Sequence, residues 1–397
     1  MLLRVFENPA FGQTMMKEKQ FLTYSVGLPR DFMNKRQKRT AVLLSAALLS
    51  ASLLTSCRTG GEAVLTYGDS VITDNQFTYY LATYKNVYLN TYADMKDTAA
   101  FYSAELPDGR TGEEYLFDQT VENVSMSLVC MELFDKNGLT LDPAVAASID
   151  SYVQSFIDDY AGGDKKALNS RLAEYGINVN MLREIYLNEE KGTALYDYLY
   201  GENGTVGVTD EELDAYYREN YIRLRHIYVN NKFYYETTEE GYASYDADGN
   251  LITHPYEGEA LTAKNAVIAA IDTALSMGAD FETVYEQYSE DRYYVNGYYL
   301  TAQTDFIDEV EKSAADLAPG EYTKVESDVG THYVLRMELD EKPWEDEANA
   351  DFFDTFEDDV KYQAFVNYVK QYLPDVVRNE EKLAEYSVED SAVNYRF

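Results

Sequence analysis

The chain is poor in basic residues: 33 Lys and Arg stand against 70 Asp and Glu among its 397 residues, and the formal net charge is −37. The first 57 residues carry +5, so the rest of the chain carries −42. A body this acidic repels nucleic-acid phosphates, whose binding depends on Lys and Arg, and it also repels anionic membranes. We therefore predict no nucleic-acid partner, and any membrane association must come from a tether. Solubility is one explanation of the charge, and a preference for basic partners is another.

Cysteine and histidine are also scarce, with two and three copies. Cys130 lies among apolar residues at helical spacing, which favours an inert core thiol over a nucleophile. Residues 64–220 show no metal-ligand spacing, no glycine-rich phosphate loop and no nucleophile elbow. We predict no cofactor, no metal site, and no catalytic group before residue 221.

Long apolar runs are missing as well. Met33 precedes a basic stretch, and the apolar segment Ala41–Leu54 that follows is too short and too rich in serine to cross about 30 Å of hydrocarbon comfortably. The order of basic, apolar and small residues predicts a signal peptide over residues 33–57. Residues 54–57 (L-T-S-C) resemble the lipobox of bacterial prolipoproteins. The resemblance implies cleavage before Cys57, a lipid on its thiol, and attachment to the extracytoplasmic face of the bacterial cell membrane.

The segments around the signal peptide follow from this interpretation. Because Met33 directly precedes the basic residues, we predict that residues 1–32 are a mis-called start, with a long leader as the alternative. Residues 58–63, which include two glycines, are predicted to be a flexible tether. With Cys57 lipidated, Cys130 would have no disulfide partner.

Apolar residues recur at helical spacing over most of residues 64–220. Capping signals divide this region, among them T-D-N-Q at 73–76, Asp142-Pro143, and T-D-E-E at 209–212. We interpret residues 64–220 as a helical client-binding domain.

The pattern changes at Tyr221. Residues 222–229 alternate as a strand does, and a polar loop follows over about 230–262. Helical spacing then predicts a helix at 263–277, and residues 331–339 alternate again.

We therefore predict an α/β module over residues 221–341, inserted in a helical domain. The C-terminal segment, residues 342–397, has apolar helical faces and is predicted to pack on residues 64–220. The predicted fold class is α+β.

Four segments of the module resemble, in the right order, the parvulin (PpiC-like) peptidyl-prolyl isomerases. They are R-H-I-Y-V at 225–229, G-A-D-F through Y-S-E-D at 278–291, L-A-P-G-E at 317–321 and V-G-T-H-Y at 329–333. Together with the helical flanks and the lipobox, they resemble the PrsA-type extracytoplasmic foldase lipoproteins.

The resemblance implies an isomerase site. Rotation about an X–Pro bond breaks no bond, but it faces a barrier of about 18–20 kcal/mol. A site must hold the proline ring against apolar groups and favour the twisted amide, and each gain of about 1.36 kcal/mol accelerates rotation about tenfold. By resemblance the catalytic residues are His226, Asp291 and His332, and the residues that contact the proline are Tyr299, Phe306 and Val310. The third histidine, His254, lies in the polar loop and is given no role.

Two departures from the family pattern leave the function open. The glycine-rich turn of the family is N-G-Y-Y-L at 296–300, with a single glycine, and Val310 offers little surface to a proline ring. The first hypothesis is a foldase that isomerises X–Pro bonds in unfolded or partly folded exported polypeptides. The second is a non-catalytic chaperone or holdase with a degenerate parvulin module. The third, a lipid-anchored binding protein for a small solute, requires two α/β lobes, which the helical pattern does not favour.

Overall fold

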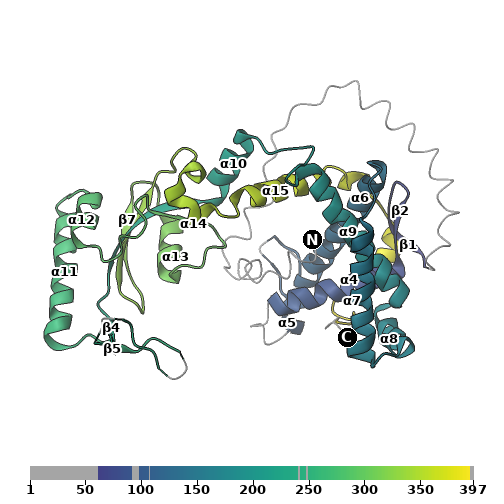
Figure 1. Ribbon diagram of the computed structural model, residues 1–397, viewed down its shortest axis with the longest axis horizontal. Coiled ribbons are helices and arrows are strands. Elements are labelled where there is room, and N and C mark those ends of the chain that lie inside the picture. Colours follow the sequence, from purple (N-terminus) through teal and green to yellow (C-terminus); the bar gives the residue numbers. More distant parts are fainter. Residues whose placement is uncertain (1–60, 92–97, 107, 240–241, 247–248, 394–397) are drawn as a thin grey trace. The chain divides into compact units, whose positions relative to one another are not determined.

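The computed structural model describes residues 61–91, 98–106, 108–239, 242–246 and 249–393 (Figure 1). The chain forms two compact units. Unit 1 contains the described residues up to Gly207 and those from Lys361 onward, and unit 2 is Val208–Val360. The predictions for residues 1–57, including lipidation of Cys57, lie outside the described residues, as do residues 58–60 of the tether.

The α+β class is confirmed, because helices are combined with small antiparallel sheets. The unit boundaries differ from those placed on the sequence. Residues 208–220 and 342–360, which the sequence analysis assigns to the helical domain, group with unit 2. The physical reason is a shared aromatic core, described below, that these two segments build together with the strand at residues 298–300.

Unit 1 is mostly helical. Its antiparallel sheet has the order β2-β1-β9, formed by β1 (Ala63–Tyr67), β2 (Ser70–Thr73) and β9 (Val377–Arg378). Its helices are α4 (Asp74–Thr91), α5 (Thr98–Ser103), α6 (Gly112–Lys136), α7 (Pro143–Ala161), α8 (Lys165–Leu172), α9 (Val179–Tyr200), the C-terminal part of α15 (Phe356–Lys370) and α16 (Glu380–Leu383).

Helix α6 lies in the core of unit 1. It begins at a capping box, in which the Thr111 side chain accepts the N–H of Glu114 and the Glu114 carboxylate accepts the N–H of Thr111. Its Cys130 is 1% exposed, and burial raises the pKa of this thiol to about 12. Cys130 is therefore a core residue, as the sequence predicts, because its thiol stays protonated at neutral pH.

Unit 2 contains a four-stranded antiparallel sheet with the order β6-β3-β8-β7. The strands are β6 (Tyr298–Leu300), β3 (Ile222–Val229), β8 (Thr331–Met337) and β7 (Tyr322–Glu326). The central pair is long: β3 and β8 align from Arg223 opposite Met337 to Val229 opposite Thr331. Because successive side chains of a strand point to opposite faces, β3 and β8 each supply both faces of the sheet.

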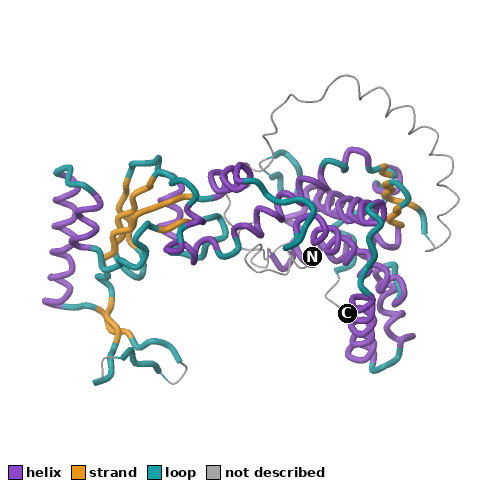
Figure 2. Tube along the Cα trace, turned by 45° about the horizontal axis from the view of Figure 1, so that its top comes forward, coloured by secondary structure: helices purple, strands orange, loops and turns teal. Residues whose placement is uncertain are grey.

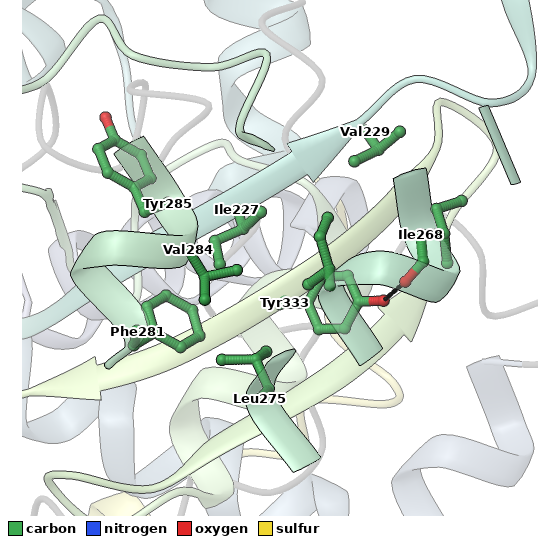
Figure 3. Close-up of a cluster of buried hydrophobic side chains, with 9 residues drawn as sticks. Ile227, Val229, Ile268, Leu275, Phe281, Val284, Tyr285 and Tyr333 are labelled. Carbon is green, nitrogen blue, oxygen red and sulfur yellow. Dashed lines mark hydrogen bonds between the residues drawn. The ribbon is translucent and has the colours of Figure 1, made fainter. Parts of the chain in front are cut away.

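Helices cover the two faces of this sheet with separate cores. On one face α11 (Gly258–Ser276) and α12 (Phe281–Tyr288) bury an apolar cluster against β3 and β8, with the Tyr333 hydroxyl donating to the Ile268 carbonyl at 3.2 Å (Figure 3). On the other face α13 (Asp308–Asp316) packs Val310 and Ala314 against Leu224, Leu300 and Val334.

Two further parts complete unit 2. Helix α10 (Asp210–Asn220), α14 (Ala350–Phe353) and the start of α15 pack around β6, in a cluster of Tyr217, Tyr221, Tyr299, Phe353, Phe356 and Val360. The segment predicted as a polar loop, residues 230–262, instead contains a hairpin of β4 (Phe233–Tyr235) and β5 (Thr253–Pro255), and α11 begins at Gly258 (Figure 2).

Candidate functional site

The pairing of β3 with β8 brings two histidines together. His226 lies opposite Val334, and Tyr228 lies opposite His332, so the two histidines are diagonal neighbours on one face of the sheet. Their rings are joined by a hydrogen bond of 2.6 Å between His226 Nε2 and His332 Nδ1. They are 2% and 0% exposed, so the pair is held inside the module rather than at its surface.

Asp291 reaches this pair from the end of α12. Its Oδ2 lies 3.3 Å from His226 Nδ1, and the same oxygen accepts a short hydrogen bond from the Tyr298 hydroxyl. Ser289 fixes the local backbone, because its hydroxyl accepts the N–H of Tyr228 at 3.1 Å and donates to the Asp291 carbonyl at 2.8 Å. Burial raises the pKa of the Asp291 carboxyl, but hydrogen bonds from His226 and Tyr298 outweigh it, and the net pKa is lowered. Asp291 is therefore ionised at neutral pH.

Ser327 closes the other end of the chain of hydrogen bonds. Its Oγ lies 2.7 Å from His332 Nε2 and accepts the N–H of Val329 at 3.1 Å. Burial lowers the pKa of His332 to about 3, with additional contributions from His226 and Lys232, so this imidazole is neutral at neutral pH.

The partners of the two rings assign a direction to the hydrogen bonds. Ionised Asp291 can only accept, so His226 Nδ1 carries a proton. His332 is neutral and carries a single proton. With that proton on Nδ1 it donates to His226 Nε2, and His332 Nε2 accepts from the Ser327 hydroxyl. In this arrangement every side chain in the series Ser327, His332, His226 and Asp291 has its hydrogen-bond partners, as a stable buried network requires.

Aromatic side chains surround this network. The ring of Tyr228 lies 5.2 Å from that of His332, with 19° between their planes. The ring of Phe306 lies 5.8 Å from that of His226 and 4.9 Å from that of Tyr298. Phe306 is partly buried, so it combines contact with the network and contact with solvent.

The structure brings only some of the predicted site residues together. His226, Asp291 and His332 come together, and Phe306 lies beside them. Val310 does not line the site: it is 0% exposed, because α13 directs it into the core against Leu224, Leu300 and Val334.

Tyr299 also lies apart from the network. It lies in the aromatic core with Tyr217 and Phe353, and its hydroxyl donates to Asp340 at 2.8 Å. Its neighbour Tyr298 occupies the site face, because adjacent residues of a strand point to opposite faces. The register of β6 against β3 is the signal that identifies Tyr298. Tyr298 pairs with Leu224, and Leu224, two residues before His226, is on the same face of the sheet as His226.

The remaining predictions concern groups away from this network. His254 is in β5, where its Nε2 lies 2.8 Å from the Glu236 carboxylate. Among the described residues, no three His, Cys, Asp or Glu side chains gather closely enough to hold a metal ion. In the same part of the chain, no helix is both long enough and apolar enough to span a membrane.

Comparison with known proteins gives matches among solved structures. No family model and no curated protein match the chain. It is similar to PrsA from Bacillus subtilis (16% identity, covering 74% of this chain and 94% of that one, TM-score 0.22). It is also similar to the foldase protein PrsA from Streptococcus pneumoniae (14%, 85% and 98%, TM-score 0.21) and to the peptidylprolyl isomerase PrsA from Bacillus cereus (18%, 69% and 91%, TM-score 0.23). These proteins belong to the group that the sequence motifs resemble, but at such identities and TM-scores the likeness assigns neither activity nor substrate.

Proposed function

We propose that this chain is an extracytoplasmic protein foldase whose unit 2 isomerises X–Pro bonds in exported, incompletely folded polypeptides. The observation that carries this proposal is the bonded pair of His226 and His332, with Asp291 at one end and an aromatic wall beside it. Such a buried, fully bonded network with a strongly lowered histidine pKa is more typical of a functional site than of a core.

The chemistry requires neither a nucleophile nor a metal. The tertiary amide before proline is nearly balanced between its isomers, so a site needs only to lower the rotational barrier. We propose that Phe306 and Tyr298 contact the proline ring, and that the amide rotates beside the Asp291–Tyr298 pair. His226 and His332 are almost completely buried, so their role is to position Asp291 and the aromatic wall rather than to touch the substrate.

The helical unit is proposed to bind the client chain. It exposes large aromatic side chains on two helices, with Tyr152 of α7 47% exposed and Tyr198 of α9 37% exposed. Tyr152 belongs to an aromatic cluster, with its ring 4.5 Å from that of Phe156 and 5.6 Å from that of Tyr186. Rings with an apolar body and a polar tip suit adaptable contact with unfolded chains.

The test is the rate of exchange of a proline-containing peptide, measured by NMR with the protein from residue 58 onward. We expect exchange to be accelerated in proportion to protein concentration. If exchange stays at the uncatalysed rate while aggregation of a denatured client is suppressed, the alternative function, a non-catalytic chaperone, is correct. The burial of Val310 favours that alternative, because it removes one predicted contact with the proline ring.

We further propose that the chain is anchored to the cell membrane through a lipid on Cys57. The support is the order of basic, apolar and small residues before Cys57. Expression of the full chain in a Gram-positive host tests this by partition into detergent. Wild type should partition and Cys57→Ser should not; equal partition and equal processed mass would contradict the anchor.

A further inference from the structure

The segment inserted between β3 and α11 forms a hairpin over its described residues, 230–239, 242–246 and 249–257, and we name these residues the arm. Beyond the β4–β5 pairing, Glu236 N–H donates to the Ile252 carbonyl at 2.9 Å and Ile252 N–H donates to the Ser244 carbonyl at 3.0 Å. Ser244 N–H in turn donates to the Glu236 carbonyl at 2.8 Å. Figures 1 and 2 show β4 and β5 standing apart from the four-stranded sheet and from α11. The arm therefore presents side chains to solvent from a hydrogen-bonded hairpin.

The arm exposes an unusual amount of aromatic surface. Leu251 is 43% exposed, and four tyrosines of the arm are 47–73% exposed: Tyr234, Tyr235, Tyr242 and Tyr245. Several exposed large rings within one short hairpin favour an interaction surface more than exposed residues scattered singly over a protein do.

The arm is also strongly acidic. Residues 230–257 contain one lysine and six acidic residues, a formal charge of −5. The lysine, Lys232, is used by the module, since its Nζ lies 3.3 Å from the Glu326 carboxylate. Within the described residues, Glu239 and Glu257 are exposed and have no ion-pair partner. Carboxylates and tyrosine faces both attract cations, so this surface complements basic side chains.

The base of the arm adjoins the candidate site. Tyr228 stacks on His332, and its pKa is raised to about 12 by burial and by neighbouring groups that include Tyr235 and Tyr256 of the arm. Lys264 of α11 links the arm to the segment after α12 that carries Asp291. Its Nζ lies 5.0 Å from the centre of the Tyr256 ring and 2.6 Å from the Glu290 carboxylate. A polypeptide bound beside the network would therefore continue onto the arm.

We propose that the arm binds basic residues that flank the proline of a substrate polypeptide. This inference rests on the proposed function, because it specifies which polypeptides the site takes. The occupant is an extended segment with Lys or Arg near its proline. The tyrosines supply contact area and cation–π attraction, and the carboxylates select the charge.

The test compares two peptides of equal length that contain one proline each, with either lysines or glutamates at the flanking positions. Their dissociation constants are measured by fluorescence anisotropy with the protein from residue 58 onward. The arm variant is Glu236→Gln with Glu239→Gln and Glu257→Gln. The matched control, Glu219→Gln with Glu286→Gln and Glu347→Gln, removes the same charge from exposed positions of α10, of α12 and of the turn before α14.

We expect the wild type to bind the lysine peptide about tenfold more tightly than the glutamate peptide at low salt, and the arm variant to lose about fivefold of that preference. Raising the ionic strength should reduce the preference in the same direction. The control variant should keep it. A second variant, Tyr234→Ser with Tyr235→Ser, should weaken binding of both peptides by severalfold.

Equal loss in the arm and control variants would show that only net charge matters and would overturn the inference. So would an arm variant that keeps the full preference while circular dichroism shows it to be folded. Binding is measured independently of isomerisation, so the two proposals can fail separately. A charge preference without catalysis would support the proposal for the arm and contradict the proposed isomerase activity. Catalysis without a charge preference would support the isomerase activity and contradict the proposal for the arm.

Discussion

The two units bury polar side chains in different ways. In unit 1, two buried charged side chains bond the backbone. The Glu132 carboxylate accepts the N–H groups of Asp69 and Ser70 at 3.0 and 3.1 Å. Lys85, 5% exposed, donates to the carbonyls of Glu389 and Ser391, each at 2.7 Å. Such bonds satisfy chain ends and turns, and they fix local structure.

In unit 2, by contrast, one group of buried polar side chains bonds one another. Ser327, His332, His226 and Asp291 form one continuous series, of which only the ends reach the backbone. Side-chain networks of this kind are sensitive to protonation at every member, and they are costly unless fully satisfied. The difference indicates that unit 1 uses polar burial for stability, whereas unit 2 uses it to build a site.

The largest effect is expected from removing the network itself. His226→Ala with His332→Ala should lower isomerisation about 100-fold, because two groups that position Asp291 and Tyr298, each contributing ~1.4 kcal/mol to the barrier, are lost together. Suppression of client aggregation should stay within twofold of wild type. Exchange NMR and light scattering on one preparation make both measurements, after circular dichroism has shown that the variant is folded. If a folded variant lost isomerisation and suppression of aggregation together, both activities would depend on these histidines, and the separation of the two roles would be contradicted.

The same comparison predicts a stability effect confined to unit 1. Glu132→Ala removes the acceptor of the β1–β2 turn and should cost ~1–3 kcal/mol, because the N–H groups of Asp69 and Ser70 lose their partner. The control is Lys136→Ala, which removes the exposed ion-pair partner of Glu132 and a cation–π contact with Tyr67 but leaves the turn's acceptor in place, and it should cost less than ~1 kcal/mol. Hydrogen exchange resolved by mass spectrometry should show faster exchange in unit 1 alone. Equal acceleration in unit 2 would contradict independent units.

Acid should move the stability of the two units in opposite directions. Unfolded His332 takes up a proton near pH 6.5, whereas the folded residue, with its pKa lowered to about 3, does not. Unit 2 therefore loses stability as the pH falls below about 6.5, by at most about 1.36 kcal/mol per pH unit from this group. Asp291, whose pKa is also lowered, adds a loss in the same direction at lower pH.

In unit 1 the sign is reversed, because burial raises the pKa of Glu189 to about 8. Its folded form binds a proton that the unfolded form releases between pH 8 and about 4.5, so stability increases as the pH falls through that range. Hydrogen exchange from pH 8 to pH 5 measures both slopes, and Glu189→Gln should flatten that of unit 1 only. Slopes of the same sign would contradict the opposed electrostatics of the two units.

The smallest effect separates two adjacent tyrosines. Tyr298→Phe removes a hydrogen bond to Asp291 and should lower isomerisation about fivefold, for a loss of ~1 kcal/mol in positioning. Tyr299→Phe removes a hydrogen bond to Asp340 in the aromatic core and should lower stability by ~1 kcal/mol without changing the exchange rate. If Tyr299→Phe were the variant that slowed exchange, the register of β6 would be wrong.

The sequence predicted the helices of unit 1 well because their ends carry explicit chemical signals. The capping signals at Thr73 and Thr209 and the Pro143 start all occur where a helix begins in the structure. Helix α11 was placed five residues late, since its N-cap residue Glu257 makes no side-chain capping bond and so leaves no signal. For the arm the sequence predicts a loop, because Gly, Asn and Asp are frequent in it and strands of only three residues are too short to show alternation.

The site was predicted in part for a similar reason. The two histidines lie on long strands whose alternation fixes their face, so their meeting could be expected. The proline contacts depend on the register of a three-residue strand and on a helix that the sequence analysis does not predict. In the structure Tyr298 rather than Tyr299 lies beside the network, and Val310 of α13 is buried in the core. Ser327 could not have been found, because its bond to His332 depends on the turn between β7 and β8.

The most direct test of this division of labour removes unit 2 from the chain. Residues 208–360 are replaced by a flexible Gly-Ser linker, and the remaining unit 1 is compared with the full chain from residue 58 onward. We expect the shortened chain to be helical by circular dichroism, to suppress aggregation of a denatured client nearly as well as the full chain, and to leave proline exchange at its uncatalysed rate. A folded unit 1 that fails to suppress aggregation, or that still accelerates exchange, would contradict the account.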